Sequence, residues 1–79
     1  MTKFVHVNDH LIQVPNDVKV VSDGMWQYLY FKDTEICTIE EGEVDSEGVY
    51  VGPYFVTNPT TFMVDEFETL EAALEFIGN

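Results

Sequence analysis

The sequence predicts an α+β fold, an antiparallel β-meander sheet or half-barrel of about five to seven strands with one C-terminal α-helix packed on one face. Three observations predict this class. Strand-favouring residues alternate through most of the chain, turn residues recur at intervals of about eight positions, and the C-terminal end changes to a helical period. With 79 residues and 46% hydrophobic content, the chain has the size and apolar content of a single domain, residues 1–79.

The first part of the chain predicts four strands separated by turns. Residues 3–7, 11–14 and 18–22 are short segments rich in Val and Ile, and each is followed by Asn, Asp or Pro. Asp23-Gly24 is a hairpin signal that leads into the most strand-like segment, residues 25–31. We therefore expect consecutive strands here to pair as hairpins.

The segment 25–31 is interpreted as a central strand with two apolar faces. Trp26, Tyr28 and Tyr30 fall on one side, whereas Met25, Gln27, Leu29 and Phe31 fall on the other. A single helix of about eight residues, roughly 12 Å long, cannot cover both faces of a five-stranded sheet. The aromatic side therefore needs another cover, either as the core of a half-barrel or as an interface with a partner or a second copy.

The second part of the chain predicts three further strands, at residues 36–40, 49–56 and 61–64. Gly52-Pro53 interrupts the middle one and predicts a bulge or an edge position there.

The C-terminal segment predicts one short helix. Thr69 is a good N-cap, Glu71 follows in the first turn, and Gly78 suits a left-handed residue after the last turn. The expected apolar stripe comprises Leu70, Ala73, Leu74 and Ile77, joined by Phe67 just upstream.

The formal charge is −12, with fifteen carboxylates, three lysines and no arginine. Such a chain repels nucleic acid and anionic membranes, so the expected partner is a basic protein surface rather than DNA, RNA or a bilayer. Twelve of the carboxylates lie within residues 33–75, which contain no lysine or arginine. We also expect a cytoplasmic protein (the host cytoplasm if the source is viral), because residues 1–9 lack the apolar run of a signal peptide and no segment is apolar enough to span a membrane.

The acidic residues come in segments, which predicts a partner-binding surface. In an extended conformation, the acids of residues 41–48 would line one side at intervals of about 6.6 Å, and the acids of the helix would oppose its apolar stripe. The expected charged contacts are Glu41, Glu43, Asp45, Glu47, Glu68, Glu71 and Glu75. Tyr50 and Tyr54 are the expected aromatic anchors beside them.

Catalytic and metal-binding patterns are weak. Cys37 lies in an apolar strand segment, which is typical of a buried structural cysteine. His6 and His10 lack the further ligands of a zinc site. Residues 43–48 match the start of a calcium-binding EF-hand loop, but Tyr54 stands where the bidentate glutamate belongs. We therefore expect no enzyme activity, no metal and no cofactor.

These observations favour a non-enzymatic inhibitor or regulatory protein that engages a basic, nucleic-acid-binding protein through its acidic surface. In size, charge and lack of catalytic groups, the chain is similar to the DNA mimics, small acidic proteins that phages make against host defence nucleases and other DNA-binding proteins. The alternative is a homo-oligomeric structural or accessory module, a homodimer for example, that uses the face of Trp26, Tyr28 and Tyr30 while its charge serves solubility.

Overall fold

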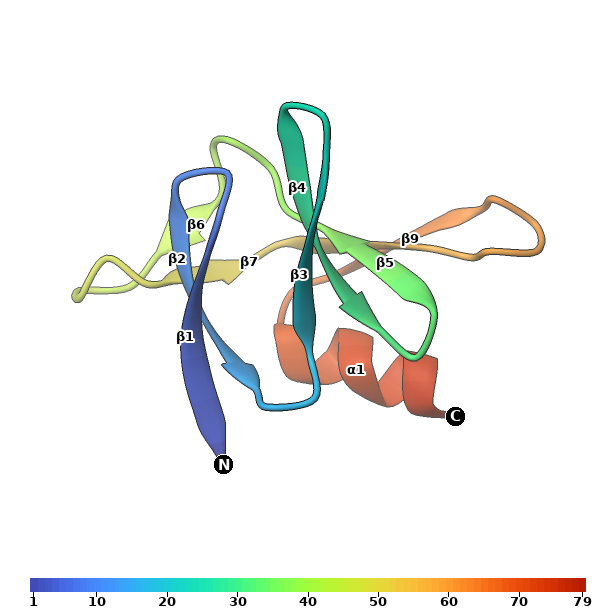
Figure 1. Cartoon of the computed structure of the whole chain (residues 1–79). Helices are drawn as coiled ribbons and strands as arrows, with labels where there is room; N and C mark the ends of the chain where they lie inside the picture. The colour runs from blue at the N-terminus through green and yellow to red at the C-terminus, as the bar shows by residue number, and fades with distance from the viewer.

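The computed structural model describes residues 1–79 and confirms the α+β class, with antiparallel ladders in three sheets and a single C-terminal helix (Figure 1). The strands are β1 Thr2–Val7, β2 His10–Pro15, β3 Lys19–Asp23, β4 Trp26–Phe31, β5 Thr34–Cys37, β6 Glu43–Val44, β7 Tyr50–Gly52, β8 Tyr54–Thr57 and β9 Val64–Phe67, and the helix is α1 Leu70–Gly78. The largest sheet has the order β3-β4-β5-β8-β9, while β1-β2 and β6-β7 are separate two-stranded ladders. Strand β4 is paired on both sides, as predicted, and β3 and β9 are the edges.

Three tight turns build the N-terminal hairpins. Asn8 and Asp9 have φ values of 49° and 72°, and Lys32 and Asp33 have values of 47° and 61°. A positive φ at both central residues is the requirement of a type I′ turn, which matches the twist of the flanking strands. Gly24 has a φ of 65° at the first position between β3 and β4, as a type II′ turn requires. The predicted hairpin pairing is therefore confirmed for β1-β2 and β3-β4, whereas it is wrong for β2 and β3, which lie in different sheets.

The turn of the β1-β2 hairpin is tied to the start of β4. The Asn8 side chain donates to the Gln27 carbonyl oxygen at 2.6 Å and accepts from the Gln27 backbone N–H at 2.9 Å. The Gln27 side-chain oxygen in turn accepts from the Asn8 backbone N–H at 3.0 Å. These reciprocal hydrogen bonds join the hairpin to the large sheet, although the two share no ladder.

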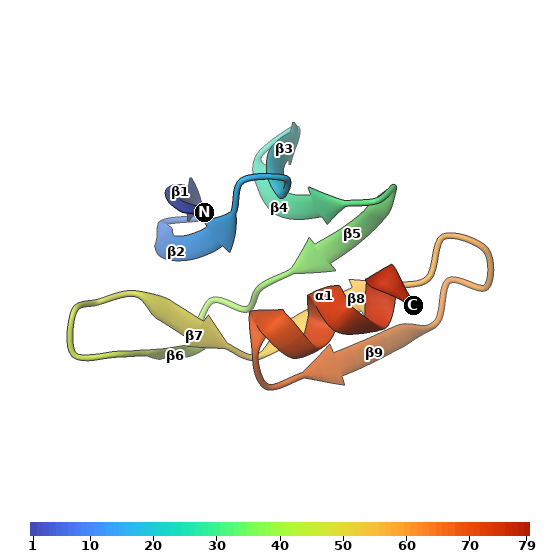
Figure 2. The same cartoon turned by 90° about the horizontal axis from the view of Figure 1, so that it is seen from below.

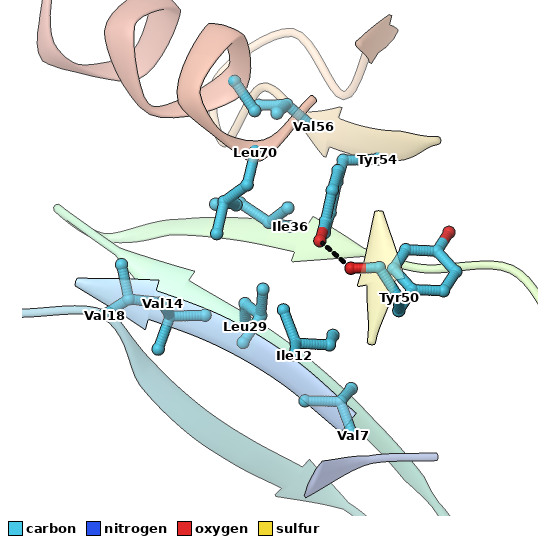
Figure 3. Packing of buried hydrophobic residues seen from close by; sticks show 11 residues of the cluster. Val7, Ile12, Val14, Val18, Leu29, Ile36, Tyr50, Tyr54, Val56 and Leu70 are labelled. Carbon is cyan, nitrogen blue, oxygen red and sulfur yellow. Dashed lines mark hydrogen bonds between the residues drawn. The ribbon is translucent and has the colours of Figure 1, made fainter. Parts of the chain in front are cut away.

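The core lies between the large sheet and a cover made of the β1-β2 hairpin and α1 (Figures 2 and 3). We call the covered side of the sheet the inner face; Leu29, Ile36 and Val56 lie on it and are buried. The cover contributes Val7, Ile12, Val14, Leu70 and Ala73. The opposite side of the sheet, the outer face, is not part of this core cluster. The hairpin thus covers the area that one short helix cannot reach.

Tyr50 and Tyr54 are core residues. Each is 2% exposed, and their rings meet edge to face with centroids 5.2 Å apart. The Tyr54 hydroxyl donates to the Tyr50 carbonyl oxygen at 3.3 Å (Figure 3), and the Tyr50 hydroxyl donates to the Pro53 carbonyl oxygen and accepts from the Ile39 N–H. The segment 49–56 forms two strands, β7 and β8, so the predicted single strand is wrong. A cis peptide bond between Gly52 and Pro53 separates β7 from β8, which belong to different sheets.

The C-terminal helix is confirmed, and its N-cap is as expected. The Thr69 side chain accepts from the Ala72 N–H at 3.2 Å, and Leu70 and Ala73 of the apolar stripe are buried. Gly78, however, is the last helical residue and has no positive φ, so its predicted left-handed role is wrong. With nine residues, α1 falls far short of the length that a bilayer-spanning helix needs.

The last strand lies later than predicted. Residues 61–63 belong to the loop between β8 and β9, and β9 begins at Val64. Asn58 organises this loop, because its side-chain oxygen accepts from the N–H groups of Thr60 and Thr61 at 2.8 and 3.0 Å. These local hydrogen bonds replace the strand ladder that the apolar residues of this segment suggested.

Candidate functional site: the acidic half and the outer sheet face

The structure separates the charges of the chain into two halves. Residues 1–32, the neutral half, carry all three lysines together with Asp9, Asp17 and Asp23. Residues 33–79, the acidic half, carry the other twelve carboxylates and no lysine or arginine. All fifteen carboxylate side chains are exposed. In Figure 2, β6 to β9 and α1 lie below β1 to β4, with β5 between them, so the sequence division is also a division in space.

A glycine brings the acidic hairpin and the acidic helix together. Gly52 pairs with Glu43 in the β6-β7 ladder, and a Cβ atom at Gly52 would collide with the backbone oxygen of Glu68. Its φ of 148° is likewise accessible in practice to glycine alone. The base of the hairpin can therefore lie directly against the segment that leads into α1. We call this region, made of Glu43, Asp45, Glu68 and Glu71, the acidic junction.

The acidic junction borders a groove of about 470 Å³ between the β1-β2 hairpin, the β6-β7 hairpin and α1. Asp45 and Glu71 line it from the two acidic elements, and Gln13 lines it from β2. Val51 and Leu74 contribute apolar surface to its walls. A groove with an apolar lining and carboxylates at its border is suited to a basic side chain, which buries its aliphatic stem and keeps its charge near the acids.

The predicted acidic ladder over residues 41–48 is not formed. Only Glu43 and Val44 are extended as a strand, and the chain then turns. The turn depends on Asp45, whose carboxylate accepts from the N–H groups of Glu47 and Val49 at 2.8 and 3.0 Å. Asp45 thus has a structural role in addition to its charge. A side chain that hydrogen-bonds two residues ahead competes with extended structure, which explains the difference.

The other predicted charged contacts, Glu41, Glu47 and Glu75, are exposed in the acidic half but lie outside the acidic junction. Glu41 precedes β6, and Glu47 lies in the turn of the hairpin. Glu75 lies one helical turn beyond Glu71, where α1 runs away from the hairpin (Figure 2). The two predicted elements therefore meet at one end and diverge at the other.

The prediction that Tyr50 and Tyr54 anchor a surface contact is wrong for this structure. Both side chains are almost completely buried, and their hydroxyls bond to backbone groups inside the protein. Burial raises the pKa of both phenols, so both are neutral at pH 7. Their aromatic surface is used to pack the hairpin base against the core.

The aromatic side of β4 lies on the outer face. Trp26 is 50% exposed, and Tyr28 and Tyr30 are partly exposed, so the interpretation of these residues as half-barrel core is wrong. Partial burial and the nearby carboxylates of Glu35 and Asp23 raise the pKa of Tyr28. Neither α1 nor the β1-β2 hairpin covers this side, because both pack on the inner face. The alternative, that this face is an interface, stays a prediction.

The sequence interpretation missed exposed apolar residues in the loop between β8 and β9. Phe62 is 77% exposed and Met63 is 68% exposed. Phe62 also has a φ of 61°, an uncommon conformation for a large side chain. The turn signal Asn58-Pro59 marked the start of the loop, but the apolar residues after it pointed to a strand.

The candidate catalytic residues do not converge. Cys37 lies partly exposed on the outer face, and burial together with Glu35 raises the pKa of its thiol, opposite to what a reactive thiolate requires. His10 stacks on Tyr50 with ring centroids 4.6 Å apart, and its Nε2 lies 2.9 Å from the Ile39 oxygen. No three His, Cys, Asp or Glu side chains are close enough together to hold a metal ion.

Comparisons with protein-family models, with curated proteins and with solved structures found no match to this chain.

Proposed function

We propose that this protein is a non-enzymatic inhibitor or regulatory protein whose acidic half binds the basic surface of a nucleic-acid-binding protein, in the manner of a DNA mimic. The observation that carries the proposal is the separation of charge: twelve exposed carboxylates and no cation in residues 33–79. A solubilising surface needs no such separation, because interspersed charges of both signs serve solubility equally well.

The spacing of the acids supports this assignment. A single DNA strand carries one charge per roughly 3.4 Å along the axis, which one protein strand cannot match because alternate residues lie about 6.6 Å apart. Two acidic elements that meet raise the local density. The acidic junction supplies such a meeting point, and its carboxylates come from β6, the following turn, and the start of α1. There, carboxylates from two elements face a basic groove together, which a single strand cannot provide.

The test uses two variants with the same net charge. The first replaces Glu41, Glu43 and Glu47 with Gln in the acidic half, and the second replaces Asp9, Asp17 and Asp23 with Asn in the neutral half. Each changes the net charge from −12 to −9. Asn is chosen because it tolerates the left-handed backbone of Asp9, which has a φ of 72°.

Each protein is immobilised and exposed to a host lysate at about 50 and 200 mM salt, and the captured proteins are identified by mass spectrometry. We expect the wild-type protein to retain a nucleic-acid-binding protein at low salt, to lose most of it at high salt, and to release it when duplex DNA is added. The neutral-half variant behaves like wild type, while the acidic-half variant captures much less. Equal capture by the two variants, or capture that duplex DNA does not compete, would refute the proposal.

A second candidate function follows from the uncovered outer face. A homo-oligomeric module would bury Trp26 and Tyr28 against a second copy, since partly exposed aromatics on an uncovered sheet face are typical of such contacts. Light scattering after size exclusion decides between the two. A wild-type oligomer that becomes a folded monomer on Tyr28→Glu substitution would favour the module, and a wild-type monomer would exclude it.

A further inference from the structure

A hollow of about 280 Å³ lies on the outer face between the β4-β5 turn and the β8-β9 loop. Tyr30 and Glu35 are direct cross-strand partners, and Thr57 pairs with Glu35 on the next strand, so these three form one row across the sheet. Asp33 of the β4-β5 turn and Phe62 of the β8-β9 loop also line the hollow. We call this hollow, lined by Tyr30, Asp33, Glu35, Thr57, Pro59 and Phe62, the outer-face pocket.

The loop that carries Phe62 is held in place by its own backbone. The Phe62 N–H donates to the Asn58 oxygen at 2.9 Å, and the Asn58 N–H donates to the Met63 oxygen at 2.9 Å. The Asn58 side-chain oxygen also accepts hydrogen bonds from the backbone N–H groups of Thr60 and Thr61. Phe62 thus presents a largely exposed ring from an ordered loop, and an ordered contact residue loses less conformational freedom when a partner covers it.

The pocket combines two aromatic rings with two carboxylates, and this combination determines what it can bind. Its volume lies below the roughly 300–1,000 Å³ of small-molecule sites, so it fits a single side chain better than a cofactor. Two negative charges favour a cation, and the aromatic rings offer faces for a cation to stack on. Lys32, the cation nearest in sequence, lies instead with its Nζ 5.5 Å from the ring of Phe31, on the other side of the strand.

We propose that the outer-face pocket receives an arginine side chain of the basic partner protein. The inference rests on the proposed function and adds a second contact with the partner, at the β8-β9 loop and away from the acidic junction. A guanidinium group suits the pocket better than an ammonium group for two reasons. It is planar and stacks on aromatic rings, and its several N–H donors reach two carboxylates at once, whereas an ammonium is a compact and strongly hydrated charge.

The test is an NMR titration of the full chain with three blocked tripeptides, Gly-Arg-Gly, Gly-Lys-Gly and Gly-citrulline-Gly, at about 20 mM salt. Citrulline keeps the shape of arginine and removes its charge. We expect saturable shifts of the amide signals of Tyr30, Glu35 and Phe62 with the arginine peptide, several-fold weaker binding of the lysine peptide, and no saturable shift with citrulline. Equal binding of arginine and lysine peptides, or shifts spread evenly over all acidic residues, would overturn the proposal.

Two variants and one control connect these shifts to the pocket. Phe62→Asn removes the ring and keeps a residue that tolerates the left-handed backbone, and Glu35→Gln removes one carboxylate. Each is expected to weaken binding of the arginine peptide by about tenfold. Asp17→Asn removes one negative charge from an exposed position in the neutral half, outside the pocket, and leaves the affinity unchanged. An unchanged affinity in Phe62→Asn would overturn the proposal.

Failure of this inference is distinguishable from failure of the proposed function. The peptide titration needs no partner protein, whereas the capture experiment uses a variant changed at Glu41, Glu43 and Glu47, none of which lines the pocket. If the wild-type protein does not bind the arginine peptide but captures a partner protein that duplex DNA releases, only the arginine pocket is refuted. Peptide binding without any DNA-competed capture refutes the proposed function and leaves a guanidinium-binding pocket.

Discussion

Replacing Gly52 with alanine tests the contact that creates the acidic junction. Two costs add at this position. The φ of 148° belongs to a region that is essentially restricted to glycine, which costs about 1–3 kcal/mol for another residue. The new Cβ also meets the backbone oxygen of Glu68, which cannot rotate away as a side chain would, and such overpacking costs about 1–3 kcal/mol. The expected loss of unfolding free energy is therefore about 4 kcal/mol.

Gly24→Ala is the matched control for this substitution. Gly24 has a positive φ of 65°, but a Cβ there would have no atom within 4 Å. Only the backbone cost applies, about 1–2 kcal/mol for a left-handed residue. The difference between the two variants, about 2–3 kcal/mol, isolates the approach of the hairpin base to the start of α1.

Urea denaturation followed by circular dichroism measures both variants. With a slope of about 1 kcal/mol per molar urea for a small protein, the midpoint falls by about 1–2 M in Gly24→Ala and by about 4 M in Gly52→Ala. A domain of this size has only about 3–5 kcal/mol of stability, so the Gly52 variant is expected to be largely unfolded in buffer. Measuring both in the same concentration of the osmolyte TMAO brings its transition into range. Equal losses in the two variants would show that Gly52 and Glu68 are not in contact.

Three further predictions concern the core and the N-terminal hairpin. Tyr50→Phe leaves the Ile39 N–H and the Pro53 oxygen without their hydrogen-bond partner and is expected to destabilise the protein by about 2–3 kcal/mol. Tyr54→Phe loses one hydrogen bond of 3.3 Å and is expected to destabilise it by about 1 kcal/mol. Urea midpoints measure both losses, and the reverse order would contradict the hydrogen-bond assignment. Asn8→Ala removes two of the three hydrogen bonds to Gln27 and a residue suited to positive φ, with an expected loss of about 2–3 kcal/mol. Asn8→Gly loses the same two hydrogen bonds but keeps a residue suited to positive φ, so it is expected to lose less, and an equal loss in both variants would contradict this account. Burial raises the pKa of Tyr50 and Tyr54, so the unfolded chain releases these two protons at a lower pH than the folded chain does. The contribution of the two tyrosines to the unfolding free energy is therefore fully present below about pH 10 and falls as the pH rises further. Thermal melts between about pH 8 and 11 test this, and a melting temperature that does not change with pH would contradict it.

Local patterns predicted those parts of the fold that depend on local interactions. The alternation of residues 25–31 identified an interior strand, and Thr69 identified the start of the helix because a side-chain oxygen there satisfies a backbone N–H of the first turn. Turn residues such as Asp23-Gly24 located the first hairpins correctly. In each case the deciding contacts lie a few residues apart in the sequence.

Contacts between distant residues decided the rest. The approach of Gly52 to Glu68, which sets where β7 ends, joins residues of two separate elements and has no sequence signal beyond the Gly-Pro pair. The burial of Tyr50 and Tyr54 depends on the hairpin base folding onto the core, and an alternating pattern cannot distinguish a core face from an interface. The acidic half was expected from composition, whereas the acidic junction and the exposed ring of Phe62 required the three-dimensional arrangement.

The charged edge of the large sheet has a consequence for self-association. Strand β9 leaves one side of its backbone without a ladder partner, and Asp65 and Glu66 lie in its middle. Two molecules placed edge to edge at β9 would bring like-charged carboxylates onto neighbouring strands about 4.8 Å apart, Asp65 on one face and Glu66 on the other, so repulsion opposes the growth of a continuous intermolecular sheet. The charged residues of the exposed edge strand therefore also disfavour fibril formation.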